Sequence, residues 1–186
     1  QSRRSVMIEL SKEQNNCLEL AKQGHNLFIT GKAGSGKSTV LESLRKVLKP
    51  GSFAYCAPTG IASQNIQGVT IHRLFGLPPK LIDSSWSPRL QESREDVLKN
   101  LETIVVDEVS MVRVDVFEAM DKVLRMAKKN DAPFGGVQLI LVGDLYQLPP
   151  VIRNEEMSYF ESRWGGGYSF LSDVYKKLSI RMVSLE

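Results

Sequence analysis

The fold of this chain is decided by Asn26-Leu27-Phe28-Ile29-Thr30-Gly31-Lys32-Ala33-Gly34-Ser35-Gly36-Lys37-Ser38. The first five residues are an apolar run typical of a short buried strand, and the last eight fit the pattern G-x-x-x-x-G-K-S. A helical pattern starts at Lys37 and runs to Leu48. In such a loop, backbone N–H groups can wrap around phosphate groups, and the helix N-terminus adds partial positive charge. The stretch therefore predicts a phosphate-binding loop (P-loop) rather than a plain glycine-rich turn with an exposed lysine.

The residues of this loop have distinct predicted roles in binding a nucleoside triphosphate. Lys37 is expected to reach the β- and γ-phosphates, and Ser38 is expected to hold Mg²⁺. We predict that the triphosphate contacts are Gly34, Ser35, Gly36, Lys37, Ser38 and Thr39.

Outward from this loop, the chain alternates between strand and helix patterns. Ser11-Lys12-Glu13-Gln14 has the form of a capping box and opens a helix that stops at Gly24. Strands joined by helices form parallel sheets through right-handed crossovers, with helices on both faces. We therefore predict an α/β fold with a central, mostly parallel sheet. The other predicted strands are Phe53–Ala57, Leu101–Val106 and Val137–Val142, a helix is predicted at Val114–Lys128, and short helical turns at Thr59–Asn65 and Thr70–Phe75.

The composition is that of an ordinary globular protein. Of the 186 residues, 42% are hydrophobic and 24% are charged, and a net charge of +3 is too small to indicate a nucleic-acid partner. Cys17 and Cys56 have no metal-ligand spacing, which favours a reducing compartment. No apolar run approaches the ~18–20 residues that span a bilayer, and the first residues have no signal-peptide character. We expect an intracellular protein without a membrane partner, in the cytoplasm or nucleoid if the source is bacterial.

The length fits one domain, because domains cluster near ~100–150 residues. Residues 1–9 are interpreted as a linker or a cloning remnant, and residues 10–186 as the domain. Residues 76–93 are interpreted as an irregular loop directed outward. The tail after Val151 is expected to lie outside the nucleotide site.

Two carboxylates follow the predicted strand 101–106. Asp107 and Glu108 stand at its carboxyl end, the edge where open parallel sheets bind ligands and where the P-loop is expected. Asp107 is suited to Mg²⁺, and Glu108 is suited to deprotonating the water that attacks the γ-phosphate. An acidic turn that only caps the next helix is the alternative, and the P-loop argues against it.

A third polar segment, Gly143 to Pro150, follows the predicted strand 137–142 and is expected at the same edge. Gln147 is the candidate sensor of the γ-phosphate, since its amide can contact both a phosphate oxygen and the attacking water. Without the other motifs, this segment would read as an ordinary turn.

These motifs, taken in order, resemble the Pif-one and RecD-like branch of superfamily-one DNA helicases. The resemblance runs from about Leu10 to Val151 and implies a RecA-like P-loop NTPase domain, the first of two motor domains, with the second absent from this chain. The amino-acid sequences of the motifs are typical of bacterial members. The resemblance rests on Gly31–Ser38, Ala57-Pro58-Thr59-Gly60-Ile61-Ala62-Ser63, Thr70-Ile71-His72, Val106-Asp107-Glu108-Val109-Ser110-Met111, Pro133-Phe134-Gly135-Gly136-Val137-Gln138 and Gly143–Val151.

The resemblance implies two sets of binding residues. ATP is the implied nucleotide, with Gln14 reading the adenine in addition to its capping-box role. Backbone amides and hydroxyls can grip a single strand of DNA without reading its sequence. The implied path of single-stranded DNA consists of Pro58, Thr59, Gly60, Thr70 and His72.

Four side chains near this path have a structural alternative. His72 is as readily a structural histidine in an apolar surround as a DNA contact. Phe75, Trp86 and Tyr146 could stack on bases, but isolated aromatic residues in a domain of this size are more often core.

The function implied is the ATPase motor of a DNA helicase that moves 5′ to 3′ on single-stranded DNA and unwinds duplex and forked DNA. The second RecA-like domain of the same full-length protein would supply an arginine finger, whose absence costs about 10³- to 10⁵-fold in rate. Two alternatives stay open. One is a P-loop ATPase switch in DNA repair or mobilisation without unwinding. The other is a nucleotide- or DNA-binding module in which the isolated chain has little turnover.

Overall fold

The computed structural model describes residues 9–144 and 148–186, and its centre is a six-stranded sheet. Every hydrogen-bonded strand pair is parallel, so the predicted mostly parallel sheet is all-parallel within the described residues. The spatial order is β3-β2-β4-β5-β1-β6. The strands are β1 (Asn26–Thr30), β2 (Phe53–Ala57), β3 (Val69–Thr70), β4 (Thr103–Val106), β5 (Gln138–Gly143) and β6 (Ile180–Ser184).

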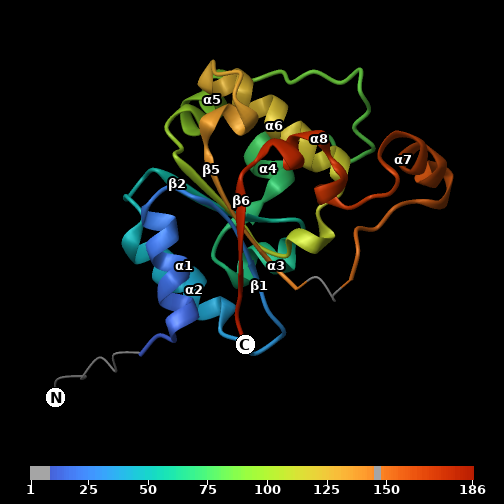
Figure 1. Ribbon diagram of the computed structural model, residues 1–186. Helices are drawn as coiled ribbons and strands as arrows, with labels where there is room; N and C mark the ends of the chain where they lie inside the picture. The colour runs from blue at the N-terminus through green and yellow to red at the C-terminus, as the bar shows by residue number, and fades with distance from the viewer. Residues whose placement is uncertain (1–8, 145–147) are drawn as a thin grey trace.

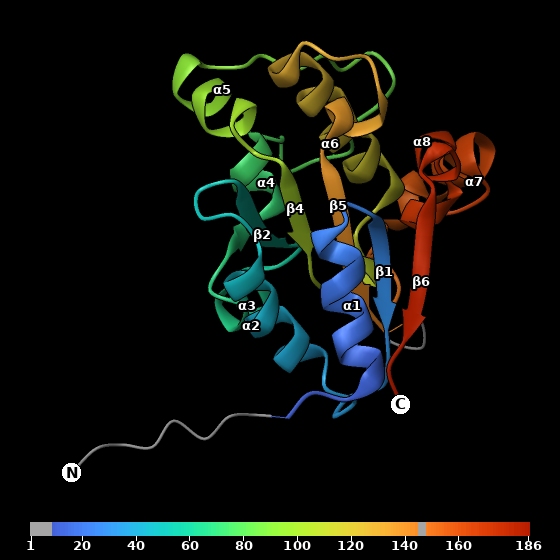
Figure 2. The ribbon, with the colours of Figure 1, turned by 60° about the vertical axis from the view of Figure 1, so that its left-hand side comes forward.

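Helices cover both faces of the sheet, which gives three layers (Figures 1 and 2). α1 and α2 lie on one face, and α4, α5 and α6 lie on the other. The helices are α1 (Lys12–Lys22), α2 (Lys37–Val47), α3 (Gly60–Asn65), α4 (Ile71–Phe75), α5 (Glu92–Lys99), α6 (Val114–Lys128), α7 (Met157–Trp164) and α8 (Asp173–Lys177), with 3₁₀ turns η1 (Val109–Met111), η2 (Pro133–Gly136), η3 (Asn154–Glu156) and η4 (Ser169–Leu171).

Alternation along the strands creates a separate core on each face. In β1, Leu27 and Ile29 pack with α1 and α2, whereas Phe28 packs on the opposite face. In β5, Ile140 likewise packs on the face of α1 and α2, and Leu141 packs on the opposite face. Successive side chains of a strand point to opposite faces, and a parallel sheet is buried on both. This explains why the strand sequences are continuous apolar runs.

Local sequence signals set the ends of the elements near the P-loop. The Ser11 hydroxyl accepts the Gln14 N–H, and the Gln14 side chain accepts the Ser11 N–H, so the predicted capping box of α1 is confirmed. β1 then runs directly into the loop, and α2 begins at Lys37 as predicted. The predicted bounds of α6 and β2 are also those of the structure.

The strand order places the loops after β1, β4 and β5 at one edge of the sheet. β5 lies between β1 and β4, and the chain leaves β1 through α2 on one face and β4 through α6 on the other. Ligands of open α/β sheets bind in the crevice at such a reversal of strand order. The topology alone therefore brings together the three predicted nucleotide motifs.

The prediction that residues 76–93 form an irregular loop directed outward is wrong. The loop after α4 does not simply point outward, because Leu77 and Ile82 are buried and the Ile82 N–H donates to Asp115 Oδ2 at 2.9 Å. This loop also ends earlier than predicted, where α5 begins at Glu92.

The tail after Val151 takes part in the central sheet. Its last strand, β6, pairs with β1 along the whole of that strand, and the Leu185 N–H donates to the Thr30 carbonyl at 2.8 Å. The tail therefore adds an edge strand that ends beside the P-loop. Among the described residues, no helix combines the length and the apolar composition needed to cross a membrane.

Candidate nucleotide-binding site

The P-loop turns through two glycines with left-handed backbone. Gly34 has φ +81° and Gly36 has φ +94°, a region that side chains with a Cβ adopt rarely. Gly36 is also the N-cap of α2 and makes no side-chain cap, so the first N–H groups of the helix face the loop. The Lys37 ammonium folds back and donates to the Gly31 carbonyl. This is the geometry that a phosphate cradle requires.

Asp107 and Glu108 follow β4 directly and face this loop. The Asp107 N–H donates to the Cys56 carbonyl at 2.9 Å, which continues the β2–β4 ladder by one residue. Glu108 then leaves the strand with φ +52° and ψ +42°, and its N–H donates to Asp107 Oδ1 at 2.9 Å. A non-glycine residue in this conformation costs about 1–3 kcal/mol and is typical of functional sites.

The P-loop and the carboxylates enclose one cavity of about 440 Å³, a size typical of small-molecule sites. The predicted residues Gly34, Gly36, Lys37 and Ser38 line it on one side. Asp107 and Glu108 line it on the other, together with Gly143 and Asp144 at the end of β5. Lys32 and Ala33 complete the lining.

Burial shifts the acid–base properties of both carboxylates. Burial raises the pKa of Asp107, against the opposing effects of the Glu108 N–H and the Lys37 charge. Burial also raises the pKa of Glu108, and the neighbouring charge of Asp107 raises it further while Lys37 lowers it. A carboxylate with a raised pKa is a better proton acceptor, which suits Glu108 to general base catalysis.

Three of the predicted nucleotide residues do not line this cavity. The Gln14 side chain reaches the P-loop, where Nε2 donates to the Gly36 carbonyl at 3.2 Å while Oε1 serves the capping box. The Ser35 hydroxyl is buried without a hydrogen-bond partner. Thr39 lies in the first turn of α2, behind Ser38. Gln147, the predicted γ-phosphate sensor, and Tyr146 lie outside the described residues.

The predicted DNA-binding residues gather at the carboxyl ends of β2 and β3. Pro58, Thr59 and His72 line a small hollow of about 180 Å³, and Gly60 begins α3 beside it. Thr70 pairs with Ala57 in the sheet. The two threonine hydroxyls cap helices, because Thr59 accepts from the Ala62 N–H and Thr70 from the Arg73 N–H, each at 3.2 Å.

The aromatic side chains and His72 have structural surroundings. Phe75 is buried in the core, and Trp86 packs partly buried against it, so the predicted core role of both is confirmed. His72 is half-buried, and burial lowers its pKa, with the Arg113 charge acting in the same direction and Asp115 opposing it. His72 is therefore neutral at pH 7 and can accept as well as donate a hydrogen bond.

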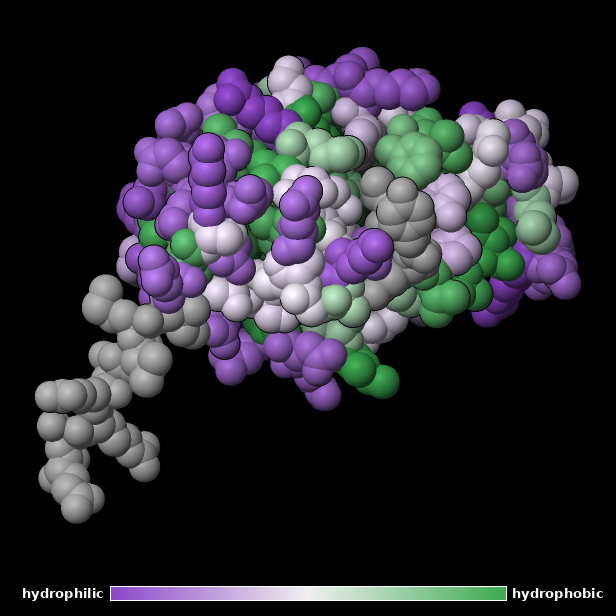
Figure 3. Space-filling view, turned by 60° about the horizontal axis from the view of Figure 1, so that its bottom comes forward, coloured by the Kyte–Doolittle hydropathy of each residue, from purple (hydrophilic) through white to green (hydrophobic). Residues whose placement is uncertain are grey.

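Apolar side chains stand exposed around this edge of the sheet. Ile61, Leu148 and Val151 are each more than 70% exposed. Figure 3 views this edge, where green hydrophobic residues lie among white and purple ones. Where such groups form one contiguous patch, they can mark a surface that a partner covers.

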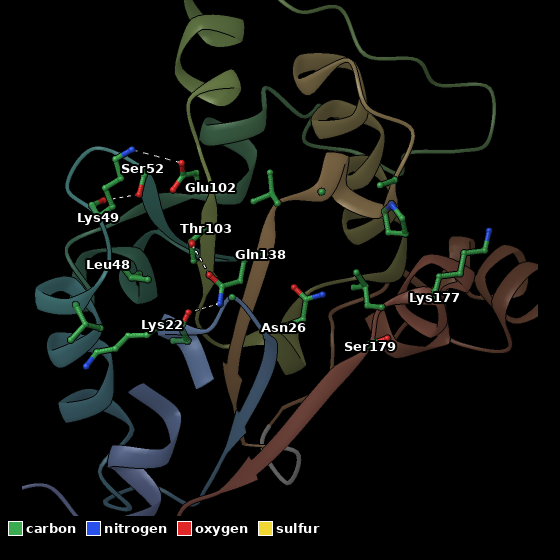
Figure 4. A pocket seen from close by; sticks show the side chains of 18 residues that line it. Lys22, Asn26, Leu48, Lys49, Ser52, Glu102, Thr103, Gln138, Lys177 and Ser179 are labelled. Carbon is green, nitrogen blue, oxygen red and sulfur yellow. Dashed lines mark hydrogen bonds and ion pairs between the residues drawn. The ribbon is translucent and has the colours of Figure 1, made fainter. Parts of the chain in front are cut away.

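A larger hollow of about 740 Å³ lies at the opposite edge, where the strands begin (Figure 4). Its polar floor is satisfied internally. Gln138 Nε2 donates to the Ala21 and His25 carbonyls, and its Oε1 accepts from the Thr103 hydroxyl at 2.8 Å. We place the functional site at the cavity of about 440 Å³, because among the described residues a phosphate cradle and carboxylates with raised pKa converge only there.

Sequence reasoning did not select two groups that the structure places near the site. Asp144 lines the nucleotide cavity. Arg113 holds the buried carboxylate of Asp115 through two contacts of 2.9 Å, next to the hollow of Pro58 and Thr59. The position of Asp144 at a strand end offered a signal for the first group. The sequence carries no signal for the Arg113–Asp115 pair, because its importance depends on the burial of Asp115.

An all-parallel sheet with a P-loop after β1 and a carboxylate pair after β4 is the architecture of RecA-like P-loop NTPases, the class that this fold defines. The PIF1-like helicase family matches residues 9–163, and the chain belongs to that family.

Individual relatives agree with this assignment. The ATP-dependent DNA helicase PIF1 of Saccharomyces cerevisiae (strain YJM789) is 41% identical over 156 residues, covering 80% of this chain and 18% of that protein. The Homo sapiens helicase of the same name is 36% identical over 163 residues, which cover 84% of this chain and 25% of that protein. The crystal structure of Pif1 helicase from Bacteroides in complex with ADP-AlF3 and ssDNA matches with a TM-score of 0.90 at 38% identity. The match covers 96% of this chain and 42% of that chain.

The chain thus spans about a quarter or less of the length of these two curated relatives. Relatives of comparable identity come from yeast, human and Bacteroides, so the bacterial source stays a prediction.

Proposed function

We propose that this chain is the ATP-binding and ATP-hydrolysing motor domain of a DNA helicase that moves on single-stranded DNA and unwinds duplex. The observation that carries the proposal is that Lys37, Asp107 and Glu108 line one cavity in a chain of the PIF1-like helicase family. The 5′ to 3′ direction rests on the family resemblance. Residues 10–186 are proposed to form the first motor domain.

The P-loop holds the triphosphate of ATP. The helix N-terminus and the loop amides attract the phosphate oxygens, and Lys37 exchanges the Gly31 carbonyl for the β- and γ-phosphates. Gln14 is proposed to select adenine, and the contact of its amide with the Gly36 carbonyl beside the cavity supports this role. A solved relative from Bacteroides holds ADP-AlF3, which supports a nucleotide at this site.

The residues present fit a magnesium ion. Ser38 and Asp107 line the same cavity and offer a hydroxyl and a carboxylate oxygen. Mg²⁺ prefers oxygen ligands and is commonly held by one or two carboxylates plus substrate phosphates. When bound, the ion would neutralise negative charge on the phosphates.

Glu108 is the proposed general base. It accepts a proton from water as the water oxygen bonds to the γ-phosphorus and the bond from that phosphorus to the bridging oxygen breaks, which releases ADP and phosphate. Lys37 stabilises the negative charge that develops on the phosphate oxygens. Gln147 is proposed to orient the water.

Pro58, Thr59, Gly60, Thr70 and His72 are proposed to contact the backbone of single-stranded DNA. A Bacteroides Pif1 structure contains ssDNA, and another solved structure is described as the basis for DNA unwinding at forked dsDNA by two coordinating Pif1 helicases, which supports both as partners. The second RecA-like domain of the full-length protein is proposed to cover the exposed apolar edge and complete the ATP cleft. The isolated chain is then expected to bind nucleotide and hydrolyse it slowly.

The first test measures binding of a fluorescent, non-hydrolysable ATP analogue with Mg²⁺ to this chain. Lys37→Ala is expected to weaken binding by about 10- to 100-fold, because charged hydrogen bonds to phosphate are lost. Lys22→Ala is the matched control, because Lys22 is exposed at the opposite edge of the sheet. Equal binding by both variants would overturn the nucleotide site.

The second test measures strand separation by the full-length protein on a duplex with a single-stranded 5′ tail. Unwinding that requires ATP and disappears in Lys37→Ala supports the motor. ATP hydrolysis stimulated by DNA without strand separation would instead favour an ATPase switch.

A further inference from the structure

The nucleotide cavity and the DNA-binding residues are joined by one short segment, Glu108 to Arg113. Glu108 begins it in the left-handed conformation, and η1 follows as a single tight turn. The Met111 N–H donates to the Glu108 carbonyl at 3.0 Å, and the Val112 N–H donates to the Val109 carbonyl at 3.1 Å. A shift of Met111 is therefore transmitted to the backbone of Glu108 by a direct hydrogen bond.

Met111 is shared by two hollows on the surface between the sites. In the smaller one it lies with Pro58, Thr59 and His72. In the other, of about 660 Å³, it lies with Thr59 and with Glu108 itself. Met111 thus stands between the proposed DNA contacts and the proposed general base.

The far end of the segment is fixed. The Arg113 guanidinium binds Asp115 through Nε and Nη2, each at 2.9 Å, and donates to the Lys80 carbonyl at 3.3 Å. The Asp115 side chain is fully buried, and Val112 is buried before it. With the Arg113 end held, a displacement of Met111 acts on Glu108, whose carbonyl accepts the Met111 N–H.

The back of the turn is also confined. Gly143 at the end of β5 lies so close that a Cβ there would meet Val109 Cγ1 at 3.0 Å and the Val109 nitrogen at 3.3 Å. The turn cannot retreat into the sheet, because protein interiors yield little to compression. If Met111 is displaced, the turn can therefore move only along the protein surface, toward Glu108.

We propose that Met111 is a positioning residue that couples occupation of the Pro58–Thr59 surface by single-stranded DNA to the placement of Glu108. DNA lying on this surface presses against the thioether side chain. The turn then shifts as a unit about the Arg113 anchor, and the Glu108 carboxylate moves toward the attacking water. This inference rests on the proposed function, because it requires DNA and ATP at the two sites.

The test compares ATP turnover by the full-length protein with and without saturating oligo-dT. Met111→Ala is expected to lower the ratio of stimulated to basal turnover by about 10-fold, within the usual range of coupling between sites. Basal turnover, the KM for ATP and the affinity for oligo-dT are expected to stay within about 2-fold. Met111→Leu, which keeps the volume and apolar character, is expected to retain the stimulation.

Two further variants guard the interpretation. Met126→Ala is the matched control, because Met126 is exposed near the end of α6 and away from both hollows. Met111→Gln keeps the length of the side chain and removes its apolar contact, so it is expected to reproduce the loss if Met111→Ala does not fold.

Three results would overturn the inference. These are an unchanged stimulation ratio in Met111→Ala and Met111→Gln, an equal loss of basal and stimulated turnover, and a loss explained by weaker oligo-dT binding. If the wild-type protein is not stimulated by DNA, the proposed function fails and the inference fails with it. A stimulated wild type with an unchanged Met111→Ala overturns the inference alone.

Discussion

Replacing Arg113 with methionine is expected to destabilise the chain strongly. The Asp115 side chain is fully buried and Arg113 is 20% exposed, so the substitution leaves a carboxylate in the interior without its counter-charge. Breaking a buried ion pair in this way costs about 3–5 kcal/mol, a large part of a total stability of about 5–15 kcal/mol. With a urea dependence of about 2 kcal/mol per molar, the unfolding midpoint should fall by roughly 2 M.

The assay is urea unfolding of this chain at pH 7, followed by circular dichroism. Arg113→Met/Asp115→Leu should recover part of the loss, because both charges are gone. The Ile82 N–H then lacks its acceptor, which still costs about 1–3 kcal/mol. Lys99→Met is the control, since it removes a pair with Asp96 in which both side chains are more than half exposed, and it should leave the midpoint unchanged. A fall of less than about 0.5 M for Arg113→Met would refute the argument.

Four further predictions concern the nucleotide site. Lys37→Ala should weaken binding of the Mg–ATP analogue by about 10- to 100-fold in a fluorescence titration, since it removes charged hydrogen bonds to phosphate, and an unchanged affinity contradicts the assignment. Gln14→Ala should reduce the preference for ATP over GTP analogues in the same titration; an unchanged preference removes Gln14 from adenine recognition. Burial and the Asp107 charge raise the pKa of Glu108 above 4.5, so turnover by the full-length protein should increase with pH above that value as the base loses its proton. An acidic limb at or below pH 4.5 would exclude this role. Burial also raises the folded-state pKa of Asp107 above 3.8, so the free energy of unfolding should fall as pH increases from 3.8 through the raised pKa. Asp107→Asn should therefore raise the melting temperature of the nucleotide-free chain at pH 7. A lower melting temperature contradicts this prediction.

The nucleotide site was largely predictable because its residues are close in sequence and stand at strand ends. Residues 31–38 identify the cradle locally, and the parallel topology then requires Asp107 and Glu108 to meet it at the same edge. The strand and helix bounds near the motifs were predictable for a similar reason, since capping boxes and apolar runs act over a few residues. Family membership follows from the order of these motifs.

The remaining features depend on contacts between residues far apart in the chain. Ile180–Ser184 has no local feature that says it will pair with β1, and residues 77–82 look like an exposed loop until Asp115 binds the Ile82 N–H. The left-handed conformation of Glu108 likewise has no local signal in the sequence, and it occurs where Val109 comes close to Gly143.

The sequence by itself therefore determined the chemistry of the proposed nucleotide site and the class of fold. Both depend on short motifs that directly follow a strand. Only the tertiary structure decided how that site lies relative to the proposed DNA-binding residues. The proposed connection runs through Met111 and the Arg113–Asp115 anchor, because burial and neighbours from distant parts of the chain bring these residues together.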